Sequence, residues 1–227
     1  MTKKRNILQN SFFNRDACEV AEDLIGKIIR KKFGENWLSA QIIETEAYYI
    51  NEKGSHASLG YTYKRKALFM PPGTIYMYYA RGKDSLNISC RGKGNAVLIK
   101  SGIPNLDKMN SNNMIKIMQS NNPTNSNKYP RTPMKLCAGQ TLLCRSLGLT
   151  VKDWDQKQFD LNQFFIENVS IRPNKIIITK RLGIPPDRDD HLLYRFIDFT
   201  NVKYCTKNPL TIRNNQIGKD YFIKNPQ

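Results

Sequence analysis

The sequence predicts a single domain of the α/β (α+β) class, built on one mixed, largely antiparallel sheet with flanking helices. Strand patterns follow one another directly at 27–33 and 37–46, and again at 86–90 and 96–100, with short glycine-containing turns that favour hairpins. Helical patterns are few, whereas a doubly wound parallel sheet would alternate strand and helix throughout. The chain of 227 residues is long enough for a proper core and contains no visible internal repeat.

The first elements expected are a helix and a hairpin. Asn14 or Asp16 can cap a helix whose apolar face extends to Leu24 before a stop at Gly26. The first hairpin follows at once, and Glu46 lies at the end of its second strand.

The middle of the chain combines a loop with a second group of strands. Residues 50–66 are expected to form a loop, and the Pro-Pro-Gly sequence at 71–73 a turn. A strand at 74–80 and a tight turn at 81–84 then lead into the second hairpin.

The rest of the chain alternates helices and short strands. A helix is expected over 104–118, although Asn and Ser interrupt its apolar pattern. The Asn-, Ser- and Pro-rich stretch 119–133 is interpreted as a mobile surface loop, and residues 1–10 as a loose basic N-terminus. A helix over 136–147 precedes strands that are expected at 164–167, 176–179 and 193–199.

The charge of the chain indicates a polyanionic partner. Lys and Arg number 36 against 19 Asp and Glu, a net charge of +17 that is divided almost equally between the two halves. A folded domain with this surplus is expected to attract nucleic acid, and a basic protein without that role is the alternative. No stretch approaches the ~20 apolar residues of a membrane span, and no apolar segment of a secretory signal follows the basic start. The protein is therefore expected inside the cell, at the nucleoid or in a nucleus.

The cysteines and histidines predict free thiols and no metal site. Five cysteines occur without a C-x-x-C pair, and Cys137 and Cys144 are spaced to share one packed helix face. The two histidines, His56 and His191, do not stand at zinc-ligand spacing from any cysteine. Neither a metal nor another cofactor is expected.

The stretch 41–49 contains the first catalytic candidate. Side chains alternate along a strand, so Glu44, Glu46 and Tyr48 share one face. A carboxylate can accept a proton from water, and an aromatic side chain can hold a flat ring. The alternative for this stretch alone is an exposed strand end with ordinary surface glutamates.

Four further candidates have structural explanations beside the functional ones. His56 lies in a polar, glycine-flanked loop, although a lone histidine is usually structural. Tyr76 and Tyr78 share a strand face that lines either a cleft or the core. Asn87 lies in a strand pattern, where a buried amide needs a partner, either a ligand edge or the backbone. The basic run at 64–66 is a solvated loop unless an anion binds there.

Together these stretches resemble the alkyladenine (3-methyladenine) DNA glycosylase family, whose members remove alkylated bases from DNA. The matches span most of residues 10–200 in the family's order, and E-T-E-A-Y followed by P-G-T-x-Y-x-Y is specific. The main motifs are I-E-T-E-A-Y at 43–48, S-H-A-S at 55–58, F-M-P-P-G-T-I-Y-M-Y at 69–78, N-I-S at 87–89 and A-V-L-I-K at 96–100. Weaker matches are L-C-A-G at 136–139, K-R-L-G-I at 180–184 and L-Y-R-F at 193–196.

The resemblance implies roles for five residues. Glu46 matches the family's general base, which deprotonates the water that attacks C1′. Tyr48, His56 and Tyr78 match residues that stack on the flipped base and hydrogen-bond to it, and Asn87 matches the residue that excludes the 2-amino group of guanine. The implied fold is a single mixed domain over 1–227, with a β-hairpin pushed into the DNA minor groove.

At other matched positions the sequence departs from the family. Lys100 stands where an arginine usually helps to hold the catalytic water, and Arg81 aligns with the wedge that fills the vacated base stack. Lys64 and Arg65 replace an Arg-Asn pair in the DNA-contact loop, and Tyr76 is grouped with these DNA contacts. The departures bear on substrate range and efficiency, and not on the class of reaction.

The sequence is therefore interpreted as a monofunctional DNA glycosylase of base excision repair. It would flip alkylated or deaminated purines from duplex DNA and hydrolyse the N-glycosidic bond without a lyase step. The expected partner is double-stranded DNA with damaged purines, bound by a monomer. Two alternatives stay open: a non-catalytic basic nucleic-acid-binding module, which leaves Glu46 without a role, and a nucleoside hydrolase, which leaves the +17 charge without one.

Overall fold

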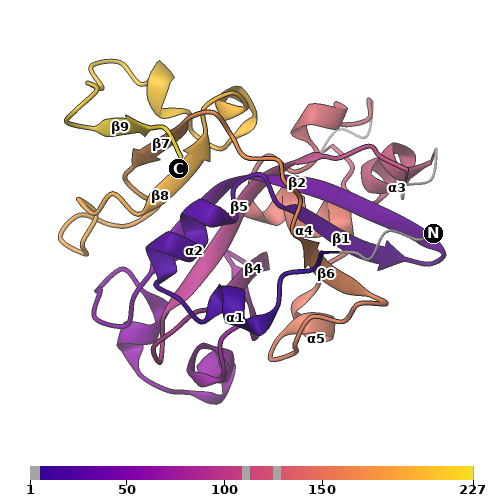
Figure 1. Ribbon diagram of the computed structural model, residues 1–227, viewed down its shortest axis with the longest axis horizontal. Coiled ribbons are helices and arrows are strands. Elements are labelled where there is room, and N and C mark those ends of the chain that lie inside the picture. The colour runs from indigo at the N-terminus through magenta and orange to yellow at the C-terminus, as the bar shows by residue number, and fades with distance from the viewer. Residues whose placement is uncertain (1–5, 109–112, 125–128, 227) are drawn as a thin grey trace.

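The computed structural model describes residues 6–108, 113–124 and 129–226, and in this part of the chain nine strands form one sheet (Figure 1). The strands are β1 (Ile28–Phe33), β2 (Asn36–Tyr48), β3 (Ile75–Ala80), β4 (Lys83–Ser89), β5 (Ala96–Pro104), β6 (Phe164–Glu167), β7 (Ile176–Thr179), β8 (Arg195–Asp198) and β9 (Tyr221–Lys224). Their order is β3-β4-β5-β2-β8-β7-β9, with β1 beside β2 and β6 beside β1, and every pair of these strands is antiparallel.

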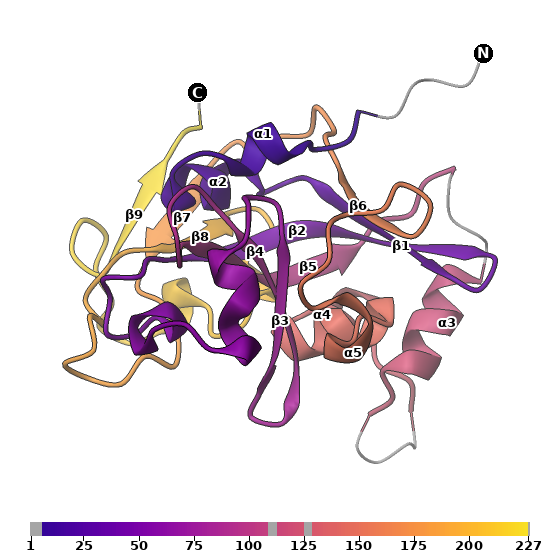
Figure 2. The ribbon, with the colours of Figure 1, turned by 90° about the horizontal axis from the view of Figure 1, so that it is seen from below.

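Helices cover both faces of this sheet. Figure 2 shows α1 (Asn10–Phe13) and α2 (Ala17–Asp23) on one side, and α3 (Met114–Asn121), α4 (Gln140–Leu147) and α5 (Val151–Trp154) on the other. The short 3₁₀ helices are η1 (His56–Leu59), η2 (Tyr63–Phe69), η3 (Pro133–Lys135), η4 (Val202–Tyr204) and η5 (Pro209–Thr211). None of the described helices is both long and apolar enough to cross a membrane.

Strand β2 is the centre of the molecule. It contains 13 residues and pairs with β1, β5 and β8. Its side chains alternate as the sequence predicts: Thr45 faces α2 and donates its hydroxyl hydrogen bond to the Ala21 carbonyl at 2.7 Å. Glu44 and Glu46 therefore point to the opposite face of the sheet, and both are fully buried.

The predicted α+β fold with a largely antiparallel sheet is confirmed, but the helix expected at 104–118 is wrong over 104–108. Strand β5 continues to Pro104, and Leu106, inside the expected helix, is 69% exposed. Helix α3 begins only at Met114, and residues 109–112 lie outside the described part of the chain. Asn and Ser have low helix propensity because their side chains compete for backbone hydrogen bonds, so a helical pattern that they interrupt is a weak prediction.

The loose N-terminus expected for residues 1–10 is wrong at its inner end. Residues 1–5 lie outside the described part, but Leu8 is buried and its N–H donates to the Ile166 carbonyl at 3.0 Å. This short segment thereby extends the sheet beyond β6.

The loop expected at 119–133 also begins later than predicted. Its first three residues complete α3, and the fully buried Asn122 donates from its amide to the Leu136 carbonyl at 3.0 Å. Residues 125–128 lie outside the described part of the chain. Helix α4 starts four residues later than expected because Gly139 has a φ of 121°, which a helix cannot include.

Candidate active site

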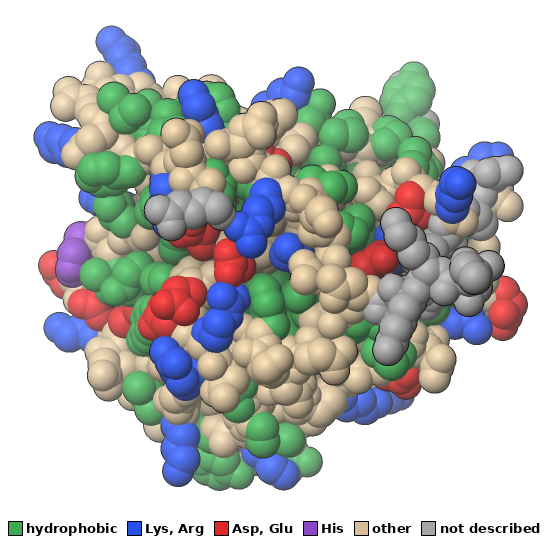
Figure 3. Space-filling model, in the orientation of Figure 1, with side chains coloured by type: hydrophobic (Ala, Val, Ile, Leu, Met, Phe, Trp, Pro, Cys, Tyr) green, Lys and Arg blue, Asp and Glu red, His purple; other side chains and the backbone are tan. Residues whose placement is uncertain are grey.

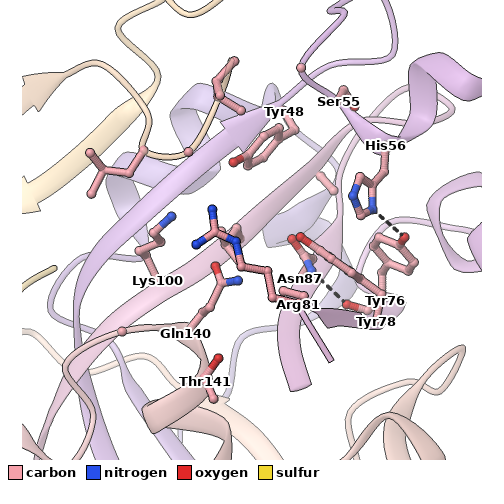
Figure 4. Close-up of a pocket in the computed structure, with 18 of the residues that line it drawn as sticks. Tyr48, Ser55, His56, Tyr76, Tyr78, Arg81, Asn87, Lys100, Gln140 and Thr141 are labelled. Carbon is pink, nitrogen blue, oxygen red and sulfur yellow. Dashed lines mark hydrogen bonds between the residues drawn. The ribbon is translucent and has the colours of Figure 1, made fainter. Parts of the chain in front are cut away.

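A row of paired residues across four strands forms the base of the candidate site. Glu46 of β2 pairs with Leu98 of β5, Leu98 with Asn87 of β4, and Asn87 with Tyr76 of β3. Directly opposed residues in antiparallel strands project from the same face, so four segments distant in sequence meet here. The pocket beside this row has a volume of about 1150 Å³ (Figure 4).

The carboxylate of Glu46 lies just behind the pocket wall. Tyr48 donates its hydroxyl to Glu46 Oε2 at 2.7 Å, and Lys100 Nζ donates to the same oxygen at 3.1 Å. The other oxygen, Oε1, accepts from the Leu182 backbone N–H at 3.0 Å. These three donors line the pocket, whereas Glu46 itself is fully buried beneath them.

The surroundings of Glu46 keep it ionised. Burial alone would raise the pKa of this carboxyl, but the Lys100 ammonium, the Arg195 guanidinium and the hydrogen bonds from Leu182 and Tyr48 outweigh burial and lower the pKa below its usual value. Glu46 therefore holds no proton at neutral pH, which is the state that a general base requires.

Three rings from two elements form an aromatic wall. The His56 ring centroid lies 4.2 Å from that of Tyr78, and Tyr76 stacks on Tyr78 at 5.4 Å with 25° between the planes. His56 Nδ1 lies 3.2 Å from the Tyr76 hydroxyl, which orients the imidazole. Partial burial and the positive charges of Arg65 and Arg188 lower the pKa of His56, so that its ring is neutral at pH 7.

Besides Tyr76 and Tyr78, the β3–β4 hairpin supplies two more of the predicted site residues, Asn87 and Arg81. Asn87 lines the pocket, is 5% exposed and donates from Nδ2 to the Tyr76 carbonyl at 3.2 Å. Arg81 and Gly82 form the two-residue turn with φ values of 51° and 76°, a type I′ geometry that fits the twist of the hairpin. Figure 4 shows the Arg81 guanidinium pointing into the pocket.

Of the remaining predicted DNA contacts, Tyr76 lines the pocket, whereas Lys64 and Arg65 do not. Lys64 is exposed on η2, and Arg65 is half-buried with Nη2 donating to the Leu59 carbonyl at 3.2 Å. Tyr76 is only 3% exposed and stands behind His56, so it presents little of its ring to solvent. Its position suits support of the pocket wall better than a contact with a DNA backbone.

Sequence reasoning missed the wall that late segments contribute to the pocket. Leu182 belongs to a motif that was recognised without a role, whereas Thr206 and Lys207 belong to no motif. Glu44 holds this last segment in place, since it accepts from Arg195 Nε at 2.7 Å and from the Thr206 N–H at 3.1 Å. Such a long-range contact leaves no local signal in the sequence.

Comparison with known proteins identifies the family. The family model of methylpurine-DNA glycosylase (MPG) matches residues 11–202. The chain belongs to the methylpurine-DNA glycosylase family. This glycosylase is 59% identical over 217 residues to a protein of Pseudomonas syringae pv. tomato, with 95% of the chain and 96% of the relative covered.

Two further relatives differ in their sequence identity to this glycosylase. A Pseudomonas aeruginosa PAO1 protein is 55% identical over 216 residues, covering 95% of this chain and 90% of its own. A Carboxydothermus hydrogenoformans protein is 27% identical over 208 residues, covering 88% and 99%. All three relatives bear the name "Putative 3-methyladenine DNA glycosylase". Family membership assigns the chain to the enzymes that cleave N-glycosyl bonds of methylated bases in DNA repair.

The surface of the glycosylase suits a nucleic-acid substrate. Figure 3 shows Lys and Arg side chains scattered over one face with Asp and Glu among them, and the whole chain carries a net charge of +17. Such a surface attracts phosphates without reading the base sequence. The residues that the structure describes contain no cluster of three or more His, Cys, Asp and Glu side chains suited to a metal ion.

Proposed function

We propose that this protein is a monofunctional glycosylase that flips alkylated or deaminated purines out of duplex DNA and hydrolyses their N-glycosidic bond with a water activated by Glu46. The observation that supports this most strongly is the buried, ionised Glu46 directly behind an open aromatic pocket. A base in the duplex is out of reach of such a group, so it must first leave the stack.

The aromatic wall favours the lesion through stacking. Tyr48 lies on one side of the pocket and His56 with Tyr78 on another, so a flat purine fits among them. A purine methylated at a ring nitrogen is cationic and is attracted to the tyrosine faces. The neutral His56 ring adds a hydrogen-bonding edge without repelling that charge.

Hydrolysis needs one water and one base in this scheme. Glu46 takes a proton from water, the water oxygen forms a bond to C1′, and the bonding electrons leave with the purine. The water would approach Glu46 at Oε2. In this structure that oxygen accepts hydrogen bonds from the Tyr48 hydroxyl and from Lys100. A cationic purine is a good leaving group, so the scheme requires no covalent intermediate and no strand cleavage. In this scheme Lys100 is the ion-pair partner of Glu46 and does not form a Schiff base.

The hairpin completes the proposal. Arg81 at its tip would fill the gap left by the flipped base, and Lys64 with Arg65 would contact the backbone nearby. Asn87 would block the space that the 2-amino group of guanine needs, since the hydrogen bond from its Nδ2 to the Tyr76 carbonyl holds its side chain in that place.

The test is release of free base from duplexes that contain 3-methyladenine, hypoxanthine or ethenoadenine, with undamaged duplex as the control. We expect release from lesion duplexes without nicking of the strand. Binding of DNA without release would instead support a non-catalytic basic module. Activity on free nucleosides that exceeds activity on duplexes would support a nucleoside hydrolase.

A further inference from the structure

Arg181, in the segment after β7, is a buried cation with no part in the proposed hydrolysis. Its side chain is 1% exposed, and Nη1 donates to the Ala47 carbonyl at 2.9 Å and to the Glu52 carboxylate. Its guanidinium carbon lies 4.6 Å from the centroid of the Tyr48 ring, which is the geometry of a cation–π contact.

The guanidinium contacts the Tyr48 ring from outside the pocket lining. Tyr48 lines the pocket, whereas Arg181 does not and is almost completely buried. Tyr194 closes the guanidinium in, with its ring centroid 5.5 Å from the same carbon. A base in the pocket and the Arg181 cation would therefore lie on opposite sides of one tyrosine ring.

Glu52 balances the charge of Arg181 only in part. Glu52 Oε1 and Arg181 Nε are buried and have no hydrogen-bond partner among the described residues. Burial raises the pKa of Glu52 even though Arg181 opposes that effect. The field at the Tyr48 ring thus depends on both members of this ion pair.

We propose that the Arg181–Glu52 pair sets the preference of the base pocket between cationic and neutral purines. The inference deepens the proposed function and depends on it. A ring attracts a cation through its electron-rich faces, and a guanidinium behind the ring both draws on that density and repels a second positive charge in front. Stacking of a neutral purine rests on dispersion and is insensitive to this charge. Arg181 therefore weakens the preference of the pocket for cationic purines. The negative charge of Glu52 opposes this weakening.

Two variants should shift the preference in opposite directions. Glu52→Gln leaves the guanidinium uncompensated, so affinity for a cationic lesion should fall relative to a neutral one. The double variant Glu52→Gln/Arg181→Met removes both charges while keeping similar volumes, so that relative affinity should rise. Glu167→Gln is the matched control, because Glu167 is paired with the buried Arg30 at 2.7 Å, far from the pocket lining.

The measurement is the ratio of KM values for duplexes with 3-methyladenine, which is cationic, and hypoxanthine, which is neutral; neither base carries the 2-amino group that Asn87 would exclude. We expect the ratio to move by about threefold or more in each direction, as for the gain or loss of one cation–π contact. The control should leave the ratio unchanged. Equal losses on both lesions, in variants that melt as folded proteins, would reduce the pair to structural support and overturn the inference.

A second measurement separates this inference from the proposed function. The affinities for the nucleosides 1-methyladenosine, which is cationic, and inosine, which is neutral, are obtained by NMR titration, which needs no turnover. If the wild-type protein releases no base, the proposed function fails while opposite shifts of the nucleoside affinities still support the role of Arg181. If it releases both bases and neither ratio moves, only the inference fails.

Discussion

Replacement of Glu46 by Gln gives the sharpest test of the catalytic scheme. The carboxylate accepts three hydrogen bonds, from Leu182 at Oε1 and from Tyr48 and Lys100 at Oε2. If the new amide keeps its oxygen toward Leu182, its NH₂ group faces Lys100, which has no acceptor to offer. The variant therefore loses both the proton acceptor and the buried ion pair.

The size of both losses follows from the geometry. Two unit charges 3.1 Å apart attract by about 5 kcal/mol at an effective dielectric constant of ~20, before desolvation is subtracted. Removing one member of a buried pair typically costs about 3–5 kcal/mol of folding stability. Loss of a general base slows the chemical step by about 10²–10⁴-fold, or roughly 3–5 kcal/mol in the barrier.

The assay is single-turnover base release from a lesion duplex, with fluorescence anisotropy to measure DNA binding and thermal unfolding to measure stability. We expect Glu46→Gln to bind lesion duplex while releasing base at least about 100-fold more slowly. Glu44→Gln is the control, because Glu44 is equally buried on the same strand face but is held by Arg195 and Thr206. The control variant should lose folding stability. Its rate of base release should fall by less than about tenfold. A Glu46→Gln variant within tenfold of wild type would refute the assignment of Glu46 as the base.

Three further changes probe the rest of the site. Arg81→Ala should weaken binding of lesion duplex more than of undamaged duplex and spare cleavage of single-stranded lesions; equal weakening on both duplexes would make Arg81 a plain phosphate contact. Asn87→Ser should gain slow release of guanine, above all from G·T pairs, by relieving a clash that costs about 1–3 kcal/mol; guanine release no faster than wild type, with lesion release intact, would show a structural role only. Lys100→Met removes the positive charge that lowers the pKa of Glu46, so the acid limb of the pH–rate profile should move to higher pH. Lys100→Arg keeps the charge and should leave the acid limb in place. An acid limb that does not move in Lys100→Met would contradict the role of the ion pair.

Local patterns in the sequence were sufficient to predict the sheet and one side of the pocket. Strand alternation placed Glu46 and Tyr48 on one face, and the tight turn expected at 81–84 includes the turn residues Arg81 and Gly82, although β4 already begins at Lys83. Both depend on neighbours within a few positions, which a sequence displays directly. The roles of these residues came from the family resemblance and stay predictions until they are tested.

The features that the sequence did not predict depend on distant contacts. Strand β5 extends to Pro104 because β2 is there to pair with it, although the local pattern favoured a helix. Leu8 is ordered by β6, and the Glu46 carboxylate is completed by the backbone of Leu182, 136 positions away. A backbone N–H is the same for every residue except proline, so no residue type could have marked Leu182 as part of the site.

The late origin of these partners matters for a chain that is still being made. Glu46 leaves the ribosome 136 residues before Leu182, and Glu44 leaves it 162 residues before Thr206. At about 5–20 residues per second, both carboxylates wait for roughly 7–30 s before these late donors exist. During that time β2 lacks its neighbour β8, so its backbone at 44–46 has an open edge that invites pairing with other chains. An unfinished chain is therefore both unable to cut a base from DNA and prone to aggregate, so synthesis under chaperone protection should raise the yield of active enzyme.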